Sequence, residues 1–179
     1  MKQFTEEELK EIYEKHVKLS PEYFKKHQFL PKCPVKAWNY SWKTHDMPRN
    51  FAILDFIEWT KKYNIKTGNC LGFTCAVDPE LEFIKYENHH YIKYPPCDLH
   101  IYLSQLENKL DFFVFNQTID HLYNPFIAIE NLYKYIKPGG YLFTTTPTVN
   151  VPHMTPIHYN QYNLMGLSIL MMSVGFEIV

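Results

Sequence analysis

The sequence lacks an excess of charge of either sign. Its 179 residues carry 18 Lys and Arg against 19 Asp and Glu, which gives a formal net charge of -1 at pH 7. A chain without a positive field does not attract nucleic acid over long distances, and a chain without an acidic surplus has no solvating tail. We therefore expect no nucleic-acid partner.

Long apolar runs are missing as well. The chain begins with MKQFTEEELK, which contains no apolar signal region. No apolar run approaches the ~20 residues that a membrane-spanning helix needs. We therefore expect a cytoplasmic protein without a membrane partner.

Cysteine is scarce, and its spacing does not indicate a metal site. The four cysteines are Cys33, Cys70, Cys75 and Cys97, and only Cys70 and Cys75 are close in the sequence. Their spacing is not a zinc-binding pattern. We expect buried free thiols in a reducing compartment rather than disulfides, and no bound metal.

The overall composition is that of a globular domain. Hydrophobic residues make up 46% of the chain and charged residues 21%. A chain of this length can bury one real core but is short for two domains. We expect a single domain over 1–179, with a helical N-terminal extension over 1–64 and a sheet core over 65–179.

Three helices are predicted in the N-terminal part. Thr5 and Glu8 form a capping-box pattern at the start of TEEELKEIYEKHVKLS, whose apolar residues recur at helical spacing. Ser20 and Pro21 are typical of the start of a second, short helix. Asp46 precedes the third helix, PRNFAILDFIEWTKKYN.

The periodicity changes after residue 65. Short apolar runs, such as LDFFVFNQ and GGYLFTTTP, alternate with helical stretches, such as YNLMGLSILMMSVG. Strands that are apolar on both faces and alternate with helices are typical of a parallel sheet covered on two sides. We therefore expect an α/β fold with a mostly parallel sheet and helices on both faces.

Polar residues follow each predicted strand. They are Asp78, Asp98, the pair Asn116 and Gln117, and the threonines 144–146. In an open parallel sheet, ligands bind beyond the carboxyl ends of the strands, so these residues are candidates for a site that takes a polar, partly aromatic ligand. The alternative is that strand ends are simply wetter than strand centres.

The order of motifs from residue 110 to 147 resembles a known family. LDFFVFNQTIDHL, a helix, IKPGGYL and FTTTP follow one another as in the class I S-adenosylmethionine-dependent methyltransferases, especially their small-molecule, type 11-like subgroup. The resemblance continues into HYNQYNLMGLSILMMSVGFEIV and covers roughly residues 95–179. It implies a reduced Rossmann-like sheet and S-adenosylmethionine as the cofactor.

The resemblance also implies roles for single residues. Asn116 and Gln117 match the place where the methionyl end of the cofactor meets the acceptor, and amides there can bond a carboxylate, an ammonium or a hydroxyl. Asp98 and the backbone of Leu99 match the position near the adenine. Asp78 resembles the acidic residue that accepts hydrogen bonds from the ribose hydroxyls.

The glycine-rich loop of the family is degenerate in this chain. KTGNCLGFT offers only Gly68 and Gly72, and Asp78 follows Gly68 by about half of the ~20 residues that a dinucleotide-type unit places between loop and acid. One interpretation is a rebuilt cofactor pocket in which Gly72, Phe73 and Thr74 replace the loop, with Gly68 and Gly72 as cofactor-binding residues. The other is a catalytically inactive scaffold or binding domain of a larger protein. We favour the enzyme.

The expected reaction is O-methylation of a small-molecule acceptor, and a sugar or glycan precursor is preferred by analogy with the subgroup. A hydroxyl acceptor needs a base, and the candidates are His121, Asp120, His153 and His158. Alternatively, Asp120 caps a helix and His121 packs or faces solvent.

Two features of the chain leave alternatives open. Trp38, Tyr40 and Trp42 either wall an acceptor pocket or anchor the N-terminal helices. After GFEIV the family adds a further strand at the sheet edge, whereas this sequence stops at Val179. A homo-oligomer, an additional domain or a continuing chain could complete that edge.

Overall fold

The computed structural model describes residues 2–15, 47–65, 70–74, 78–92, 98–148 and 157–179. Several sequence-based predictions lie outside these ranges. They concern the helix at Ser20, the aromatic residues Trp38 to Trp42, Gly68 and His153.

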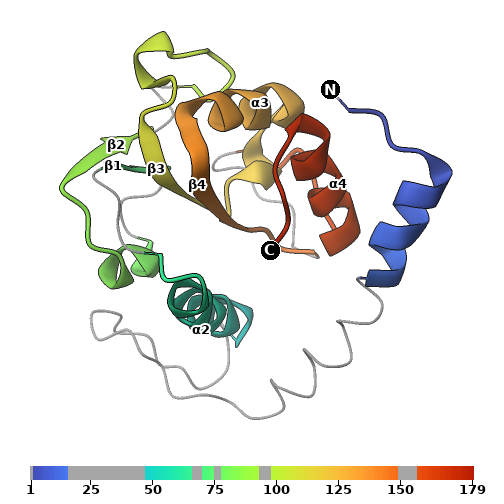
Figure 1. Cartoon of the computed structure of the whole chain (residues 1–179), viewed down its shortest axis with the longest axis horizontal. Helices are drawn as coiled ribbons and strands as arrows, with labels where there is room; N and C mark the ends of the chain where they lie inside the picture. Colours follow the sequence, from blue (N-terminus) through green and yellow to red (C-terminus); the bar gives the residue numbers. More distant parts are fainter. Residues whose placement is uncertain (1, 16–46, 66–69, 75–77, 93–97, 149–156) are drawn as a thin grey trace.

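Four parallel strands form the sheet. In chain order they are β1 (Cys70–Phe73), β2 (Asn88–Tyr91), β3 (Leu110–Asn116) and β4 (Ile136–Thr145). Their spatial order is β2-β1-β3-β4 (Figure 1). The predicted parallel α/β sheet is therefore confirmed.

This strand order creates one switch point. The chain passes from β1 to β2 on one side, then returns to place β3 on the other side of β1, and β4 follows beyond β3. Ligands of open α/β sheets bind in the crevice where the direction of strand order reverses, outside the carboxyl ends of the strands. Here that place lies at the ends of β1 and β3.

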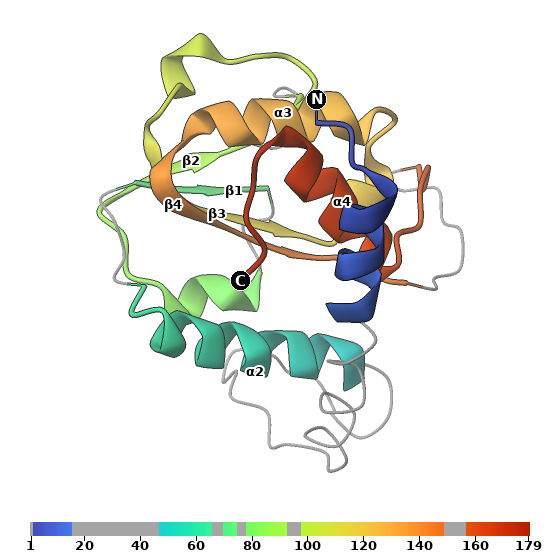
Figure 2. The ribbon, with the colours of Figure 1, turned by 45° about the vertical axis from the view of Figure 1, so that its right-hand side comes forward.

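Helices cover both faces of the sheet. The helices α3 (Pro125–Tyr135) and α4 (Leu164–Val174) lie on one face, and α2 (Met47–Lys62) lies on the other with the short helix η1 (Pro79–Phe83) beside it (Figure 2). Two further one-turn helices are η2 (Ser104–Leu106) and η3 (Ile119–His121). None of the helices in the described ranges is long and apolar enough to cross a membrane.

The N-terminal residues pack beside α4. Residues 6–15 are helical and run alongside α4 in both views (Figures 1 and 2), and the Lys2 N–H donates to the carbonyl of Ser173 at 2.7 Å. The predicted capping box is confirmed, because the Thr5 N–H donates to Glu8 Oε2 at 2.9 Å and the Glu8 N–H donates to Thr5 Oγ1 at 3.2 Å.

Strand β3 supplies both hydrophobic cores. Successive side chains of a strand point to opposite faces, so Phe113 and Phe115 pack with α3 and α4, while Phe112 and Val114 pack with Phe56 of α2. All four β3 side chains are buried. Phe56 shares this core, so α2 packs on the sheet. The change of apolar periodicity after residue 65 therefore marks only the change from helices to alternating strands and helices.

The irregular first part of β4, where the register with β3 shifts, needs its two glycines for different reasons. Gly139 has φ +78°, a backbone conformation that side chains with a Cβ rarely adopt. A Cβ on Gly140 would lie 2.9 Å from the carbonyl oxygen of Asp111 in β3. In the part of the chain that the structure describes, no strand pairs with the outer edge of β4, and residues 176–179 are not in a strand.

Candidate active site

Two threonine side chains and one backbone carbonyl connect the carboxyl ends of β1 and β3. The Thr118 hydroxyl donates to the carbonyl of Asn116 at 2.7 Å. Its oxygen is therefore the acceptor in the 2.9 Å hydrogen bond with the hydroxyl of Thr74, the residue that follows β1. These contacts lie at the switch point of the sheet, where a ligand is expected.

Asn116, the last residue of β3, directs an amide donor into this region. Thr145 Oγ1 donates to Asn116 Oδ1 at 3.1 Å, which identifies the other terminal atom as the nitrogen. The side chain is 1% exposed, and Nδ2 has no hydrogen-bond partner among the described residues. A buried amide donor without a partner is costly unless a ligand accepts from it. It fits the carboxylate of an amino-acid group.

Gln117 is held beside Asn116 by the end of β4. Its N–H donates to the carbonyl of Thr145 at 2.8 Å, and its side-chain amide donates to Thr145 Oγ1 at 3.3 Å. Gln117 has φ +47°, an uncommon conformation for a residue other than glycine. The chain therefore turns sharply at the point where β3 ends.

A cluster of ionisable side chains follows at the next turn. It consists of Asp120, His121 and His158, and it is called the Asp120 cluster below. Asp120 Oδ2 lies 3.6 Å from His121 Nε2 and 3.7 Å from His158 Nε2. The one-turn helix η3 brings the neighbours Asp120 and His121 together, and helix α3 is capped by Asn124 instead of Asp120.

Residues 157–160 cross over η3 and complete the Asp120 cluster. The N–H groups of Tyr159 and Asn160 both donate to the carbonyl of Asp120, at 2.8 and 3.1 Å. The Asn160 side-chain amide donates to the carbonyl of Leu122 at 2.5 Å. The backbone thus fixes His158 next to η3, although the two segments are far apart in the sequence.

Solvent reaches His121 more than the other two members of the Asp120 cluster. The side chain of His121 is 13% exposed, against 2% for Asp120 and 3% for His158. His121 Nδ1 lies 3.2 Å from the carbonyl of Ile157. A carbonyl only accepts, so Nδ1 carries the proton and Nε2 of the neutral ring is the atom that can take a proton.

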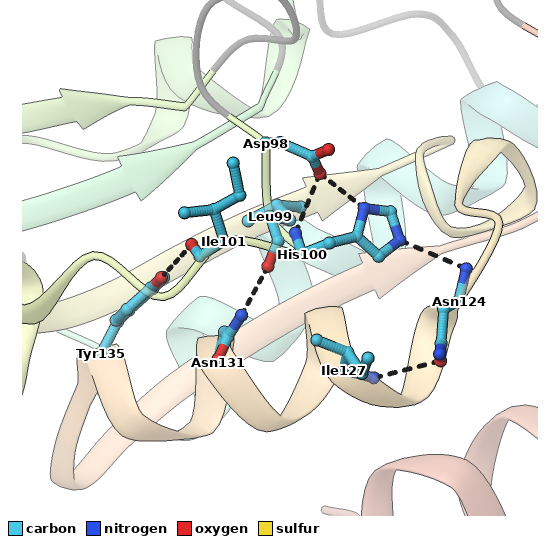
Figure 3. Close-up of polar contacts among 8 residues, drawn as sticks. All are labelled: Asp98, Leu99, His100, Ile101, Asn124, Ile127, Asn131 and Tyr135. Atoms are coloured by element: carbon cyan, nitrogen blue, oxygen red, sulfur yellow. Dashed lines mark hydrogen bonds and ion pairs between the residues drawn. The ribbon is translucent and has the colours of Figure 1, made fainter.

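Leu99 is anchored by α3, and Asp98 is held by its neighbour His100 (Figure 3). Asp98 Oδ1 accepts from the backbone N–H of His100 at 2.9 Å, and the Leu99 carbonyl accepts from Asn131 Nδ2 at 2.7 Å. Further along, burial raises the pKa of Tyr135, so its hydroxyl keeps its proton and donates to the carbonyl of Ile101 at 3.2 Å.

Neither Gly72 nor Asp78 belongs to a glycine-rich loop: Gly72 lies within β1, and Asp78 directly precedes η1. Gly72 lies inside β1, where a Cβ would come within 2.3 Å of the Phe113 ring, so packing alone accounts for the glycine. Asp78 is buried and precedes η1, on the side of the sheet that α2 covers. Their roles in cofactor binding stay predictions.

The sequence reasoning missed Thr118 and His100. Thr118 directly follows Asn116 and Gln117, so the polar segment at the end of β3 is one residue longer than was expected from the sequence. His100 lies two residues after Asp98, a spacing at which an aspartate side chain accepts from the backbone and forms an Asx-turn. That spacing was the available signal for His100.

No better candidate for a functional site lies elsewhere in the described residues. No three His, Cys, Asp or Glu side chains within it are grouped as ligands for a metal ion. A hollow lined by His89, His90, Asn108, Lys109 and Lys137 lies at the opposite, amino-terminal edge of the sheet, away from the strand ends where α/β sheets bind ligands.

Comparisons with known proteins agree with the fold. A family model described as "Methyltransferase domain" matches residues 44–173, which is more than half of the chain. The mitochondrial ubiquinone biosynthesis O-methyltransferase of Rattus norvegicus is 33% identical over 80 residues. That match covers 40% of this chain and only 23% of the rat protein.

Two solved structures share the fold at low sequence identity. The [4+2]-cyclase SpnF has a TM-score of 0.53 at 16% identity, covering 90% of this chain and 70% of its own. An S-adenosylmethionine-dependent methyltransferase of Thermotoga maritima, described as a possible histamine N-methyltransferase, has a TM-score of 0.50 at 16% identity, covering 94% and 81%. The sequence-based prediction is confirmed, and the chain belongs to the class I methyltransferase domain family, whose cofactor is S-adenosylmethionine.

Proposed function

We propose that this domain transfers a methyl group from S-adenosylmethionine to a hydroxyl oxygen of a small molecule. The observation that carries the proposal is the Asp120 cluster. It follows the end of β3 directly, and it places the more exposed His121 against the buried Asp120. A base beside the cofactor site is what a hydroxyl acceptor requires, because its proton must leave as the oxygen attacks.

The residues at the strand ends fit the cofactor. Asn116 Nδ2 is a buried donor suited to the carboxylate of the methionyl end, and Asp98 Oδ2 is an acceptor suited to the exocyclic amine of adenine. The bound cofactor supplies an activated methyl group, and the electron pair of the broken carbon–sulfur bond stays on sulfur. The hydroxyl proton of the acceptor passes to Nε2 of His121.

Asp120 and His158 support His121 in this reaction. When Nε2 takes the proton, the ring becomes an imidazolium, and the carboxylate of Asp120 at 3.6 Å stabilises that charge. The hydrogen bond from Nδ1 to the carbonyl of Ile157 fixes the ring and its tautomer. His158 Nε2 lies 3.7 Å from the same carboxylate oxygen.

Two exposed aromatic side chains lie beside the Asp120 cluster. Tyr123 is 62% exposed and Tyr159 is 51% exposed, with ring centroids 6.4 Å apart. Aromatic faces suit the apolar face of a sugar as well as a flat ring. A sugar or glycan precursor stays the preferred acceptor class, and the name of the rat relative supports oxygen as the acceptor atom.

Methyl transfer is tested directly with methyl-labelled S-adenosylmethionine. We expect label to appear in one class of hydroxyl compound when sugars, nucleotide sugars and phenols are offered, together with an equal amount of S-adenosylhomocysteine. A matched set of amines serves as the control for the acceptor atom. Cofactor binding without transfer to any hydroxyl would favour the non-catalytic alternative, and label in amines alone would contradict the proposed acceptor atom.

A further inference from the structure

His100 is a buried imidazole that the proposed reaction does not use. Its side chain is 6% exposed, and it lies between the Asp98 segment and the start of α3 (Figure 3). A buried histidine with polar contacts on both ring nitrogens is held in one orientation. The fixed ring in turn determines the orientation of the groups that it contacts.

The hydrogen bonds of His100 determine its tautomer. The backbone N–H of Asn124 donates to His100 Nε2 at 3.2 Å, so Nε2 carries a lone pair. Nδ1 therefore carries the proton and donates to Asp98 Oδ1 at 2.5 Å. The backbone N–H of His100 donates to the same oxygen at 2.9 Å. Two donors from one residue thus hold one oxygen of Asp98.

The second oxygen of Asp98 is left for a ligand. Oδ2 points away from the His100 ring (Figure 3), and it has no hydrogen-bond partner within the described ranges. Rotation of the carboxyl group would break both bonds to Oδ1. His100 therefore determines the direction in which Oδ2 can accept a hydrogen bond.

His100 is held in place by Tyr123 and Asn124, which follow His121 in the sequence. Its ring stacks on Tyr123, with centroids 3.8 Å apart and planes inclined by 20°. Asn124, which donates to Nε2, also caps α3 by accepting from the Ile127 N–H at 3.4 Å. The Asp98 segment is thereby tied to residues that directly follow the Asp120 cluster.

We propose that His100 is a positioning residue that aims Asp98 Oδ2 at the exocyclic amine of the cofactor adenine. Because this role presumes the adenine placement of the proposed function, its test must separate the two. A general packing role would lower affinity for every ligand equally. A positioning role makes affinity depend on whether the ligand carries the amine.

The test compares S-adenosylhomocysteine with S-inosylhomocysteine, which carries an oxygen in place of the amine. We expect the wild-type chain to prefer the first by about 10-fold or more, as befits one charge-assisted hydrogen bond. His100→Phe keeps the stacking on Tyr123 and the backbone N–H donor but removes the Nδ1 donor, and it should reduce this preference clearly. His100→Asn retains a donor at the position of Nδ1 and should restore part of the preference.

Asp98→Ala separates the possible failures. If it abolishes the preference while His100→Phe leaves the wild-type preference intact, the positioning role is wrong and the adenine placement stands. If Asp98→Ala also leaves the preference intact, the adenine placement itself is wrong. If the wild-type chain binds neither compound, the proposed function fails as a whole. An equal loss of affinity for both compounds in His100→Phe would show a merely structural role and would overturn the proposal.

Discussion

Asp120→Asn should lower kcat by about 10²–10⁴-fold, the usual contribution of a positioned acid or base. The substitution keeps the size of the side chain and removes the charge that stabilises protonated His121 at 3.6 Å. The affinity for S-adenosylhomocysteine should change little, because Asp120 lies on the acceptor side. Initial rates with the acceptor identified by label transfer, together with calorimetric binding, measure the two effects separately.

The controls for this prediction use another aspartate and a second member of the Asp120 cluster. Asp111→Asn changes an aspartate at the start of β3 that pairs with Lys137 at the opposite edge, and kcat should stay near the wild-type value. His121→Gln should lose as much as Asp120→Asn, and the double variant should lose no more, because the two residues act as a unit. Additive losses, or an unchanged kcat in Asp120→Asn, would contradict the assigned roles.

Phe56→Ala should lower the free energy of unfolding by about 3–5 kcal/mol, the range for large aromatic side chains deleted from a core. The ring of Phe56 is 0% exposed, and its centroid lies 4.6 Å from that of Phe143 and 6.2 Å from that of Phe112. It anchors α2 on the sheet together with Trp59, whose ring centroid lies 5.7 Å from that of Phe143 and 5.8 Å from that of Phe112. Urea unfolding followed by circular dichroism gives the difference.

Phe126→Ala provides the matched control for Phe56→Ala. It removes the same side chain from a helix, but Phe126 is 44% exposed, so the loss should stay below about 1 kcal/mol. Equal losses for the two variants would mean that α2 does not share the core. The sheet would then be covered on only one face.

The parallel sheet could be predicted because its signal is local. LDFFVFNQ is apolar at successive positions, and a strand with that pattern needs cover on both faces. The Thr5–Glu8 capping box is equally local, since both hydrogen bonds join residues three positions apart. Patterns of this kind involve only short segments, so they can be recognised without knowledge of the tertiary structure.

The supporting contacts of the site could not be predicted in the same way. His158 meets Asp120 because residues 157–160 fold back over η3, and His100 is held by the amide of Asn124, 24 residues away. Sequence spacing gives no distance between such segments. The close packing of Gly72 against the ring of Phe113 is another contact that the sequence did not indicate, and the role of Gly72 in cofactor binding stays a prediction.

Fold alone does not assign the chemistry. One structure with this fold is that of a [4+2]-cyclase, and a shared fold hosts unrelated reactions when the side chains of the site differ. The proposal of methyl transfer therefore depends on the buried amide of Asn116, the oriented carboxylate of Asp98 and the Asp120 cluster. Each of these groups is proposed to contact a different part of the cofactor or acceptor, so each can be tested by its own substitution.

Calorimetric titration of the chain with S-adenosylhomocysteine, repeated with the Asn116→Leu variant, tests whether the cofactor binds at the end of β3. We expect a dissociation constant in the micromolar range for the wild-type chain and a large loss of affinity in the variant, because leucine cannot donate a hydrogen bond from the end of β3. Absence of heat and of any thermal shift at millimolar ligand would contradict cofactor binding by this chain. Unchanged affinity in Asn116→Leu would instead place the cofactor elsewhere.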